Sequence, residues 1–334
     1  MYSLLLLKTH KNNHTMKIIL IGSDPSSLLV FNHLSEKGYL VGVCTESEEF
    51  KNNYFSTIET VDSFALNRSN IQSDFPNWLQ TKNPDLILVC GLGLKLTKDI
   101  LSIPKLGCFN IHFGKLPENR GPDPLFWSIK NGDPETAISI HQMDAGWDTG
   151  KIVISQTIPI ILGETAGMLN SKMSYQLPDL MDKMLSKVKN ELTSVEQSTK
   201  GKIQYNKRPI EQDITIDWEN QNADDIERLI NACNPKYGGA TTYYQGAKIK
   251  ILEVSPVENQ TPLFGRTPGE IVHAHPQEGL FICCRYGQLL RLNVISTDAG
   301  ILSGTKYVNL GLKPGQLFTT TNSVQQKSTI DNNY

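Results

Sequence analysis

The stretch Met16-Lys17-Ile18-Ile19-Leu20-Ile21-Gly22 decides the fold, because its continuous apolar run is typical of a buried β-strand. A helix is expected from Ser26 to about Lys37, where Gly38 stops it, and a second strand from Leu40 to Cys44. This strand–helix–strand alternation predicts an α/β domain with a mostly parallel sheet and helices on its faces. No Gly-x-Gly-x-x-Gly motif follows the first strand, so we expect a Rossmann-like domain that does not bind a dinucleotide.

Two further apolar runs continue this sheet and end in glycine-rich loops. Pro84 to Cys90 predicts a buried strand that leads into Gly91-Leu92-Gly93-Leu94. Cys108-Phe109-Asn110-Ile111-His112 predicts the next strand, and the following loop is too rich in glycine and proline to be regular. After a short helix around Leu125 to Lys130, a strand-like run from Thr136 to Met143 leads into the loop Asp144-Ala145-Gly146-Trp147-Asp148-Thr149-Gly150.

Asn110, His112 and Asp148 form a candidate catalytic set. Asn110 and His112 lie two residues apart on a strand, so their side chains project from the same face. An amide N–H and an imidazole N–H can both donate to a carbonyl oxygen that becomes negative, and losing one such donor typically costs about 100- to 1000-fold in turnover. Asp148 can orient His112 and accept a proton from an attacking amine, directly or through water. This chemistry suits transfer of a one-carbon acyl group.

Two simpler interpretations compete with a catalytic role. A single histidine after an apolar run is commonly a structural residue. The loop from Asp144 to Gly150 also superficially resembles a calcium-binding loop, but it lacks the full acidic series and terminal glutamate of an EF-hand. We therefore expect no metal, and the combination of amide, imidazole and carboxylate favours catalysis.

The chain resembles the folate-dependent formyltransferases, which include methionyl-tRNA formyltransferases, amino-sugar N-formyltransferases and glycinamide ribonucleotide transformylase. The resemblance implies that Asn110, His112 and Asp148 are the catalytic triad and that 10-formyltetrahydrofolate is the formyl donor. It extends from about Met16 to about Phe318 and rests on Asn110-Ile111-His112, Leu116-Pro117, Arg120-Gly121, Pro124, and Asp144 to Gly150.

The same resemblance implies where the two substrates bind. Relatives hold the pterin ring through the backbone of small loops, which can approach a flat heterocycle closely. Many relatives carry Pro-Ser after the catalytic histidine, whereas this chain has Phe113-Gly114, so the acceptor side differs. We expect the donor at Leu92, Gly93, Leu94, Asp144, Ala145, Gly146 and Trp147, and the acceptor at Phe113, Gly114 and Arg120.

The C-terminal half predicts a second, smaller domain. Met168 to Leu192 is helical by its apolar spacing, with Pro178 kinking the helix or starting another. A helix from Ala223 to Ala232 precedes five short strand-like runs, which predict a small OB-like β-barrel. These runs are Ala240 to Tyr244, Ile249 to Val254, Gly269 to Val272, Leu280 to Cys284 and Leu289 to Val294. We expect a disordered extension at 1–15 (Met16 is an alternative start), a catalytic domain at 16–193, a linker at 194–204, the OB-like domain at 205–318 and a disordered tail at 319–334.

Composition describes an ordinary globular chain. The 334 residues carry a formal net charge of −2, with 39% hydrophobic and 20% charged residues, which argues against a strongly basic nucleic-acid binder. Six scattered cysteines show no metal spacing, and a reducing cytoplasm fits them. No apolar stretch approaches the roughly 20 residues that span a bilayer, so no membrane partner is expected.

The acceptor is left open between two kinds of amine. A transfer RNA needs several phosphate-neutralising lysines and arginines, and the C-terminal half has no dense basic cluster. The sequence therefore favours a small amine, such as a nucleotide-linked amino sugar, over initiator tRNA. Hydrolysis of the formyl donor by the same triad is a further alternative, although relatives of that type carry an N-terminal regulatory domain for which there is no room before Met16. The oligomeric state is not predicted.

Overall fold

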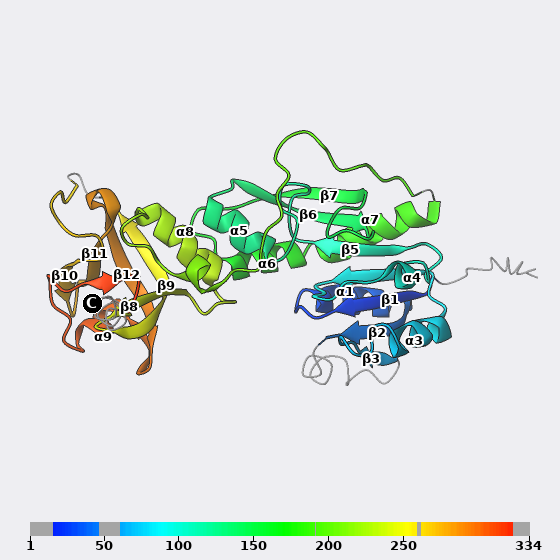
Figure 1. The fold of residues 1–334 in the computed structure, drawn as a ribbon, viewed down its shortest axis with the longest axis horizontal. Helices are drawn as coiled ribbons and strands as arrows, with labels where there is room; N and C mark the ends of the chain where they lie inside the picture. The colour runs from blue at the N-terminus through cyan, green and yellow to red at the C-terminus, as the bar shows by residue number, and fades with distance from the viewer. Residues whose placement is uncertain (1–15, 47–60, 191, 259–261, 323–334) are drawn as a thin grey trace, which may run out of the picture. The chain divides into compact units, whose positions relative to one another are not determined.

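The computed structural model describes residues 16–46, 61–190, 192–258 and 262–322. The expected extension at 1–15 and most of the expected tail, 323–334, lie outside the described residues. The chain divides into two compact units, each built from three stretches of sequence (Figure 1). The N-terminal unit comprises Met1–His112, Ile140–Ile154 and Gln176–Glu196, and the C-terminal unit comprises Phe113–Ser139, Ser155–Tyr175 and Gln197–Tyr334.

A seven-stranded sheet begins in the N-terminal unit, with strand order β3-β2-β1-β4-β5-β6-β7. The strands from β3 to β5 are parallel, as predicted, and the order reverses between β1 and β4. In such sheets, ligands bind beyond the carboxyl ends of the strands near this reversal. The strands are β1 (Ile18–Gly22), β2 (Leu40–Thr45), β3 (Ser63–Ala65), β4 (Leu86–Cys90), β5 (Cys108–His112), β6 (Glu135–Gln142) and β7 (Ile152–Pro159); β6 and β7 contribute residues to both units.

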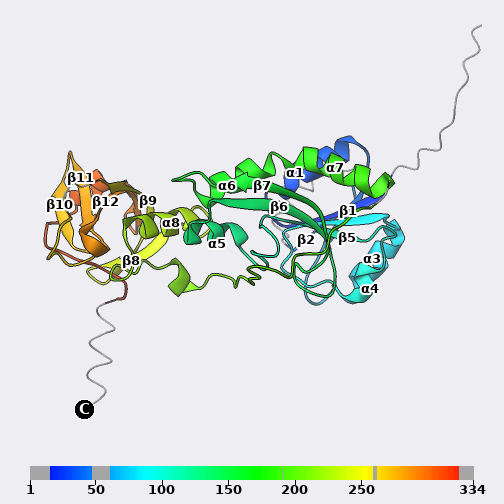
Figure 2. The ribbon, with the colours of Figure 1, turned by 90° about the horizontal axis from the view of Figure 1, so that it is seen from above.

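Helices cover both faces of the parallel strands. Figure 2 shows α1 (Ser27–Glu36) and α7 (Leu177–Asn190) over one face, and α3 (Asp74–Lys82) and α4 (Lys98–Leu101) over the other. Alternate residues of each strand face one layer. The layer beneath α3 and α4 is fully apolar, and its core comprises Ile19, Ile21, Ile87, Val89, Phe75, Leu79 and Ile100.

Pro178 separates two helices, which resolves the alternative left open by the sequence. The first helix, α6 (Ala166–Ser174), belongs to the C-terminal unit, and α7 begins at Leu177. Pro178 therefore lies in the first turn of α7. Backbone N–H groups in the first turn of a helix have no hydrogen-bond partner within the helix, so the N–H that proline lacks is not missed there.

The C-terminal unit contains a curled antiparallel sheet, as the OB-like prediction required. Its strands follow the order β10-β11-β12-β9-β8-β14, with β13 paired to β12. The backbone of Glu270 pairs with that of Leu317, which joins the beginning of β10 to β14 and closes the sheet into a small barrel. The strands are β8 (Ala240–Tyr244), β9 (Ala247–Val257), β10 (Ile271–His275), β11 (Gly279–Cys283), β12 (Leu289–Thr297), β13 (Gly300–Ser303) and β14 (Phe318–Thr319).

Two helices stand beside the barrel strands in this unit. α8 (Ala223–Cys233) packs on β9 and on α5 (Pro124–Asn131), and its start is fixed by a capping box between Asn222 and Asp225. The indole N–H of the buried Trp218 donates a hydrogen bond to the hydroxyl of Thr242 at 2.9 Å. The sequence did not predict β13, β14 or the short helix α9 (Gly304–Val308), and β10 starts later than the expected Gly269 because Gly269 has a left-handed φ of 87°.

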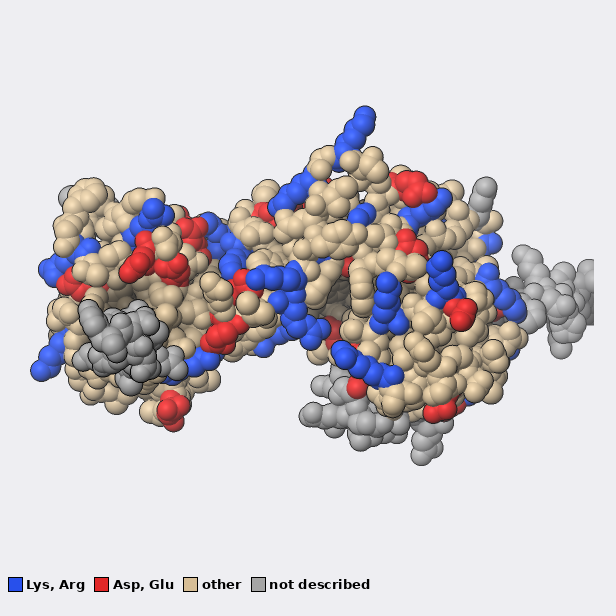
Figure 3. All heavy atoms as spheres, viewed as in Figure 1, with Lys and Arg blue, Asp and Glu red and all other residues tan. Residues whose placement is uncertain are grey.

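The described surface carries mixed charge. On the face shown in Figure 3, lysines and arginines are interspersed with aspartates and glutamates over the barrel strands. No helix among the described residues is long and apolar enough to cross a membrane.

Candidate active site

Asn110 and Asp148 meet beside His112 at the end of β5. The Asn110 amide Nδ2 donates to Oδ1 of Asp148 at 3.2 Å, and Nδ1 of His112 lies 3.8 Å from Oδ2 of the same carboxylate. Both ionisable side chains are largely shielded, with side-chain exposures of 8% for His112 and 11% for Asp148. The structure therefore brings together the three residues that the sequence proposed as a triad.

His141 on β6 is a fourth member of this cluster, which the sequence interpretation missed. Its Nε2 lies 3.2 Å from Nδ2 of Asn110 and 3.3 Å from Oδ1 of Asp148. Its Nδ1 lies 2.8 Å from the carbonyl oxygen of Gln142, and since a carbonyl only accepts, Nδ1 carries the proton. A histidine within the apolar run from Thr136 to Met143 was the available signal, because burial of an imidazole requires partners.

Small and polar residues fix the shape of the loop that carries Asp148. Oδ1 of Asp144 accepts from the Gly146 N–H at 2.9 Å and from the Thr149 hydroxyl at 2.5 Å. A Cβ on Gly146 would lie 2.0 Å from the Thr149 hydroxyl oxygen, and a Cβ on Gly150 would lie 1.9 Å from the Gln142 carbonyl oxygen. Asp148 itself is in the left-handed region at φ 53°, which aspartate tolerates better than most residues. The glycines are therefore steric requirements of the loop.

A cavity of about 330 Å³ opens beside this loop. Cys108 lines it at the start of β5, and Asp144, Thr149 and Gly150 line it from the loop that carries Asp148. The lining residues include no member of the candidate triad. Its size falls in the range of small-molecule pockets. The cavity is lined by Leu101, Gly107, Cys108, Gln142, Met143, Asp144, Thr149, Gly150, Lys151 and Glu196.

The residues predicted to hold the donor are divided between this cavity, the core and the surface. Asp144 lines the cavity, while Ala145, Gly146 and Trp147 are exposed. Leu92 and Leu94 pack on the same core cluster as Met143, which lines the cavity. Between them, the Gly93 N–H donates to Oε2 of Glu46 at 2.6 Å.

The residues predicted to contact the acceptor belong to the C-terminal unit. The carbonyl of Gly114 accepts from the Ser139 hydroxyl at 2.7 Å, and Phe113 is half-buried. The Arg120 guanidinium is buried, and it donates to the Gln197 side chain and to the Tyr205 hydroxyl. Contact of these residues with an acceptor stays a prediction.

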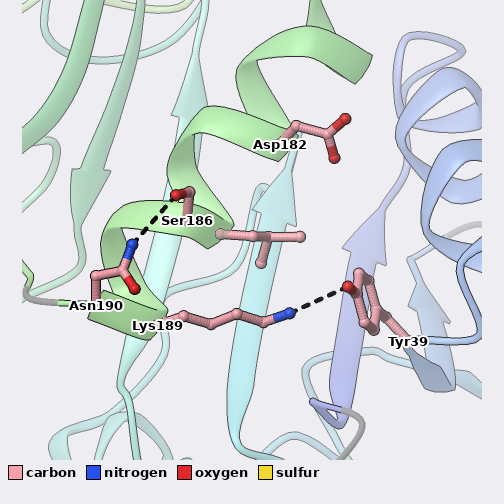
Figure 4. Close-up of a pocket in the computed structure, with 6 residues that line it drawn as sticks. Tyr39, Asp182, Ser186, Lys189 and Asn190 are labelled. Atoms are coloured by element: carbon pink, nitrogen blue, oxygen red, sulfur yellow. Dashed lines mark hydrogen bonds between the residues drawn. The ribbon is translucent and has the colours of Figure 1, made fainter. Parts of the chain in front are cut away.

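A second cavity, of about 230 Å³, lies between α7 and Tyr39, and its lining includes no candidate triad residue (Figure 4). There Lys189 donates to the Tyr39 hydroxyl at 3.1 Å, and Asp182 accepts from Lys37. Lys37 and His33 hold the pKa of Asp182 below its usual value. Among the described residues, no group of three or more His, Cys, Asp or Glu side chains is arranged to hold a metal ion.

Two family models account for most of the chain. The formyl transferase model matches residues 1–185, which include the whole candidate triad, and the formyl transferase C-terminal domain model matches residues 210–309. The chain belongs to the formyl transferase family. The predicted enzyme class and the predicted pair of folds, a Rossmann-like domain followed by a small barrel, are thereby confirmed.

Relatives of this formyltransferase include enzymes named methionyl-tRNA formyltransferase. That of Alkaliphilus oremlandii is 30% identical over 77% of this chain and 84% of its own length. That of Acetivibrio thermocellus is 28% identical over 90% of this chain and 98% of its own length.

Solved structures share the fold of this formyltransferase at lower identity. HypX from Aquifex aeolicus, solved with tetrahydrofolic acid, has a TM-score of 0.64 at 17% identity and covers 92% of this chain and 51% of its own. An N-formyltransferase from Helicobacter canadensis, solved with folinic acid and dTDP-3-aminofucose, has a TM-score of 0.59 at 15% identity and covers 83% of this chain and 98% of its own.

Proposed function

We propose that this formyltransferase moves a formyl group from 10-formyltetrahydrofolate to a primary amine, with Asn110, His112 and Asp148 as the catalytic residues. The observation that carries the proposal is the convergence of Asn110 and His112 on the carboxylate of Asp148, which lies on a loop whose other residues line a cavity. An amide donor, an imidazole and a proton acceptor are what acyl transfer to an amine requires.

Each residue has one task in this proposal. Nδ2 of Asn110 has two hydrogens, which face Asp148 and the unprotonated Nε2 of His141. In this proposal the amide exchanges one of these bonds for the formyl oxygen as the amine nitrogen attacks and that oxygen becomes negative. His112 is the second donor to the same oxygen. Asp148 accepts the proton that the amine loses as the new C–N bond forms. The old C–N bond then breaks and its nitrogen takes up a proton, so the transfer is proton-neutral.

The cavity at the Asp144 loop is the proposed site of the donor's ring. A flat heterocycle needs close approach to backbone, and Asp144, Thr149 and Gly150 of this loop line the cavity. Solved relatives bind tetrahydrofolic acid or folinic acid, which supports the same ligand class here. We place Leu92, Gly93 and Leu94 on the other side of this ring.

For the acceptor we propose a nucleotide-linked amino sugar. The formal net charge of −2 favours a small substrate over a polyanion. Phe113 and Gly114, at the start of the acceptor loop, are the proposed contacts. A solved relative binds dTDP-3-aminofucose.

A second candidate acceptor is initiator methionyl-tRNA. It is favoured by the relatives named methionyl-tRNA formyltransferase, one of which aligns over 90% of this chain and therefore includes the barrel. Both acceptors present a primary amine, so the same triad serves either reaction.

One incubation separates these proposals. The full chain is mixed with 10-formyltetrahydrofolate and, in parallel, with nucleotide-linked amino sugars or charged initiator tRNA, and the products are measured by mass. We expect one formyl group on an amino sugar and none with the His112→Ala variant. Formylation of the tRNA alone would replace the proposed acceptor, and formate release without any amine would indicate a hydrolase instead.

A further inference from the structure

Arg120 is bound by a segment of chain that lies far from it in sequence. Its Nε and Nη2 donate to Oε1 of Gln197 at 3.0 and 2.7 Å, and its Nη1 donates to the Tyr205 hydroxyl at 2.8 Å. The guanidinium also stacks on the Tyr205 ring, 5.3 Å from the ring centre. Only 9% of Arg120 is exposed, so its two bonds to Gln197 form away from water and are correspondingly strong, whereas Tyr205 is itself 55% exposed.

The backbone on either side of Arg120 is bound to the same segment. The Arg120 N–H donates to the Gln204 carbonyl at 3.1 Å, and the Asn206 N–H donates to the Arg120 carbonyl at 2.7 Å. Gly121 follows with φ 88°, and a Cβ there would lie 2.4 Å from the Asn206 carbonyl oxygen. Residues 204–206 therefore pair with this part of the loop through their backbone, in one parallel bridge between Tyr205 and Arg120. We call residues 197–206 the strap.

Two further contacts fix the rest of the same loop. Nδ2 of Asn206 donates to Asn119 at 3.1 Å, and Asn119 donates to the Ser128 hydroxyl at 3.1 Å, so a chain of amides leads from the strap into α5. At the far end, Asp123 accepts from the Tyr237 hydroxyl at 2.8 Å and pairs with Lys236. Burial and the bond to Asp123 raise the pKa of Tyr237, so this hydroxyl remains a donor at neutral pH.

We propose that Arg120 is a positioning residue, which through Gln197 and Tyr205 holds the loop of residues 113–124 in the shape that receives the acceptor. This inference rests on the proposed function, because that loop begins at the residue after His112 and carries the proposed contacts Phe113 and Gly114. The alternative, direct contact of Arg120 with an anionic part of the acceptor, would break bonds that the guanidinium already makes. The planar fork of arginine fits one carboxamide oxygen and one hydroxyl together, and a lysine cannot reproduce it.

Removal of the partner distinguishes positioning from direct contact. We expect Gln197→Leu to lower kcat/KM for the acceptor by about 10- to 100-fold, as a displaced loop would, while the KM for 10-formyltetrahydrofolate is unchanged. Arg120→Lys should give a similar loss, and the double variant should be no worse than either single variant. Tyr205→Phe, which keeps the ring and removes the hydroxyl, should give a smaller loss of the same kind.

The matched control is Arg266→Ala, which removes an exposed arginine that pairs with Glu270 on the barrel. It should behave as wild type. Wild-type kinetics for Gln197→Leu beside a severe loss for Arg120→Lys would establish direct contact and overturn the positioning role. An equal loss of donor and acceptor affinity, with a lowered Tm, would show that the strap contributes only to overall stability, and it would also overturn the positioning role.

A readout without substrate keeps this inference separate from the proposed function. Trypsin cleaves after Lys115, at the start of the loop, and after Lys202, within the strap. We expect Gln197→Leu to accelerate both cleavages relative to Arg266→Ala, as measured by mass spectrometry of the fragments. If cleavage is accelerated but the wild-type protein formylates no amine, the role of Arg120 and Gln197 in holding the loop is supported and the proposed function is wrong. If the wild-type protein transfers the formyl group but Gln197→Leu changes neither the cleavage nor the kinetics, the proposed function is supported and the positioning role of Arg120 is wrong.

Discussion

At the scale of single residues, the candidate site buries a carboxylate among an amide and two imidazoles. Asp148 is largely buried, and a buried carboxylate requires donors. Asn110 supplies one, and the imidazoles of His112 and His141 flank the same carboxylate. The cluster that satisfies the buried charge is thus also the cluster that can move a proton.

The roles of His112 and Asp148 predict a loss of turnover without a loss of donor binding. His112→Ala and Asp148→Asn should each lower kcat by about 100- to 10,000-fold, because each removes a group used as the amine attacks. The dissociation constant of 10-formyltetrahydrofolate, measured by fluorescence or calorimetry, should stay the same. His33→Ala, which alters a histidine on α1, is the control. Near wild-type turnover in either triad variant would contradict the assignment.

His141 should act through Asp148 and Asn110. His141→Ala removes the imidazole whose Nε2 lies 3.2 Å from Asn110 and 3.3 Å from Asp148, so we expect kcat to fall about tenfold while the donor still binds. The combination with Asp148→Asn should lose less than the product of the two single losses, because the two residues share one contact. Fully multiplicative losses would show that His141 acts independently of the carboxylate.

The cysteines predict slow thiol chemistry in the folded protein. All six are free and buried, and burial raises the pKa of the Cys90 and Cys108 thiols to about 12. A raised pKa favours the neutral thiol, so at pH 8 the reactive thiolate is on the order of one molecule in ten thousand, against roughly one in four for a free cysteine. We expect Ellman's reagent to react slowly with native protein and with six thiols in guanidinium chloride. A rapid native phase would place a cysteine at the surface.

At the scale of elements, the loop between β6 and β7 makes the sharpest steric prediction. Gly150→Ala places a Cβ against the Gln142 carbonyl, and neither backbone can move cheaply, so we expect about 1–3 kcal/mol of destabilisation together with reduced turnover. Gly93→Ala is the contrast, because its Cβ would lie 3.4 Å from the Glu46 carboxylate, an ordinary contact at the end of a flexible side chain. Denaturant unfolding and kcat measure both. Equal stability of the two variants would contradict this view of the loop.

The sequence predicted those helices and strands whose signals lie within the element itself. The apolar run at Ile18–Gly22, the capped helix at Ala223–Cys233 and the restart of the helix near Pro178 each carry their own signal. Asn110, His112 and Asp148 could be proposed together because residue types and a family pattern coincided. His141 could not, since its partners come from another strand and another loop. Closure of the barrel depends on the pairing of Glu270 with Leu317, a contact between distant residues that no local pattern encodes.

At the scale of the whole molecule, the proposed function assigns different tasks to the two units. The N-terminal unit contains the candidate triad and the cavity, whereas the C-terminal unit contains the loop of residues 113–124 and the strap that binds it. The chain leaves the triad at His112 and enters that loop at Phe113, so the catalytic strand and the acceptor loop are consecutive in sequence. The proposed function therefore predicts that a different acceptor within the family goes with changes in the loop and the strap rather than in the triad.

The salt dependence of catalysis tests the acceptor at this largest scale. A protein that neutralises 6–10 phosphates of a nucleic acid loses about 10³–10⁵ in affinity between 50 and 200 mM salt, because each contact releases counterions. A nucleotide-linked sugar offers only its own few phosphate charges. With 32 lysines and arginines against 34 aspartates and glutamates, the chain has no excess of positive charge to concentrate. We therefore expect kcat/KM for the acceptor to fall less than tenfold over this range. A fall of a hundredfold or more would identify a polyanionic acceptor, because discrete contacts with a small substrate cannot release that many ions.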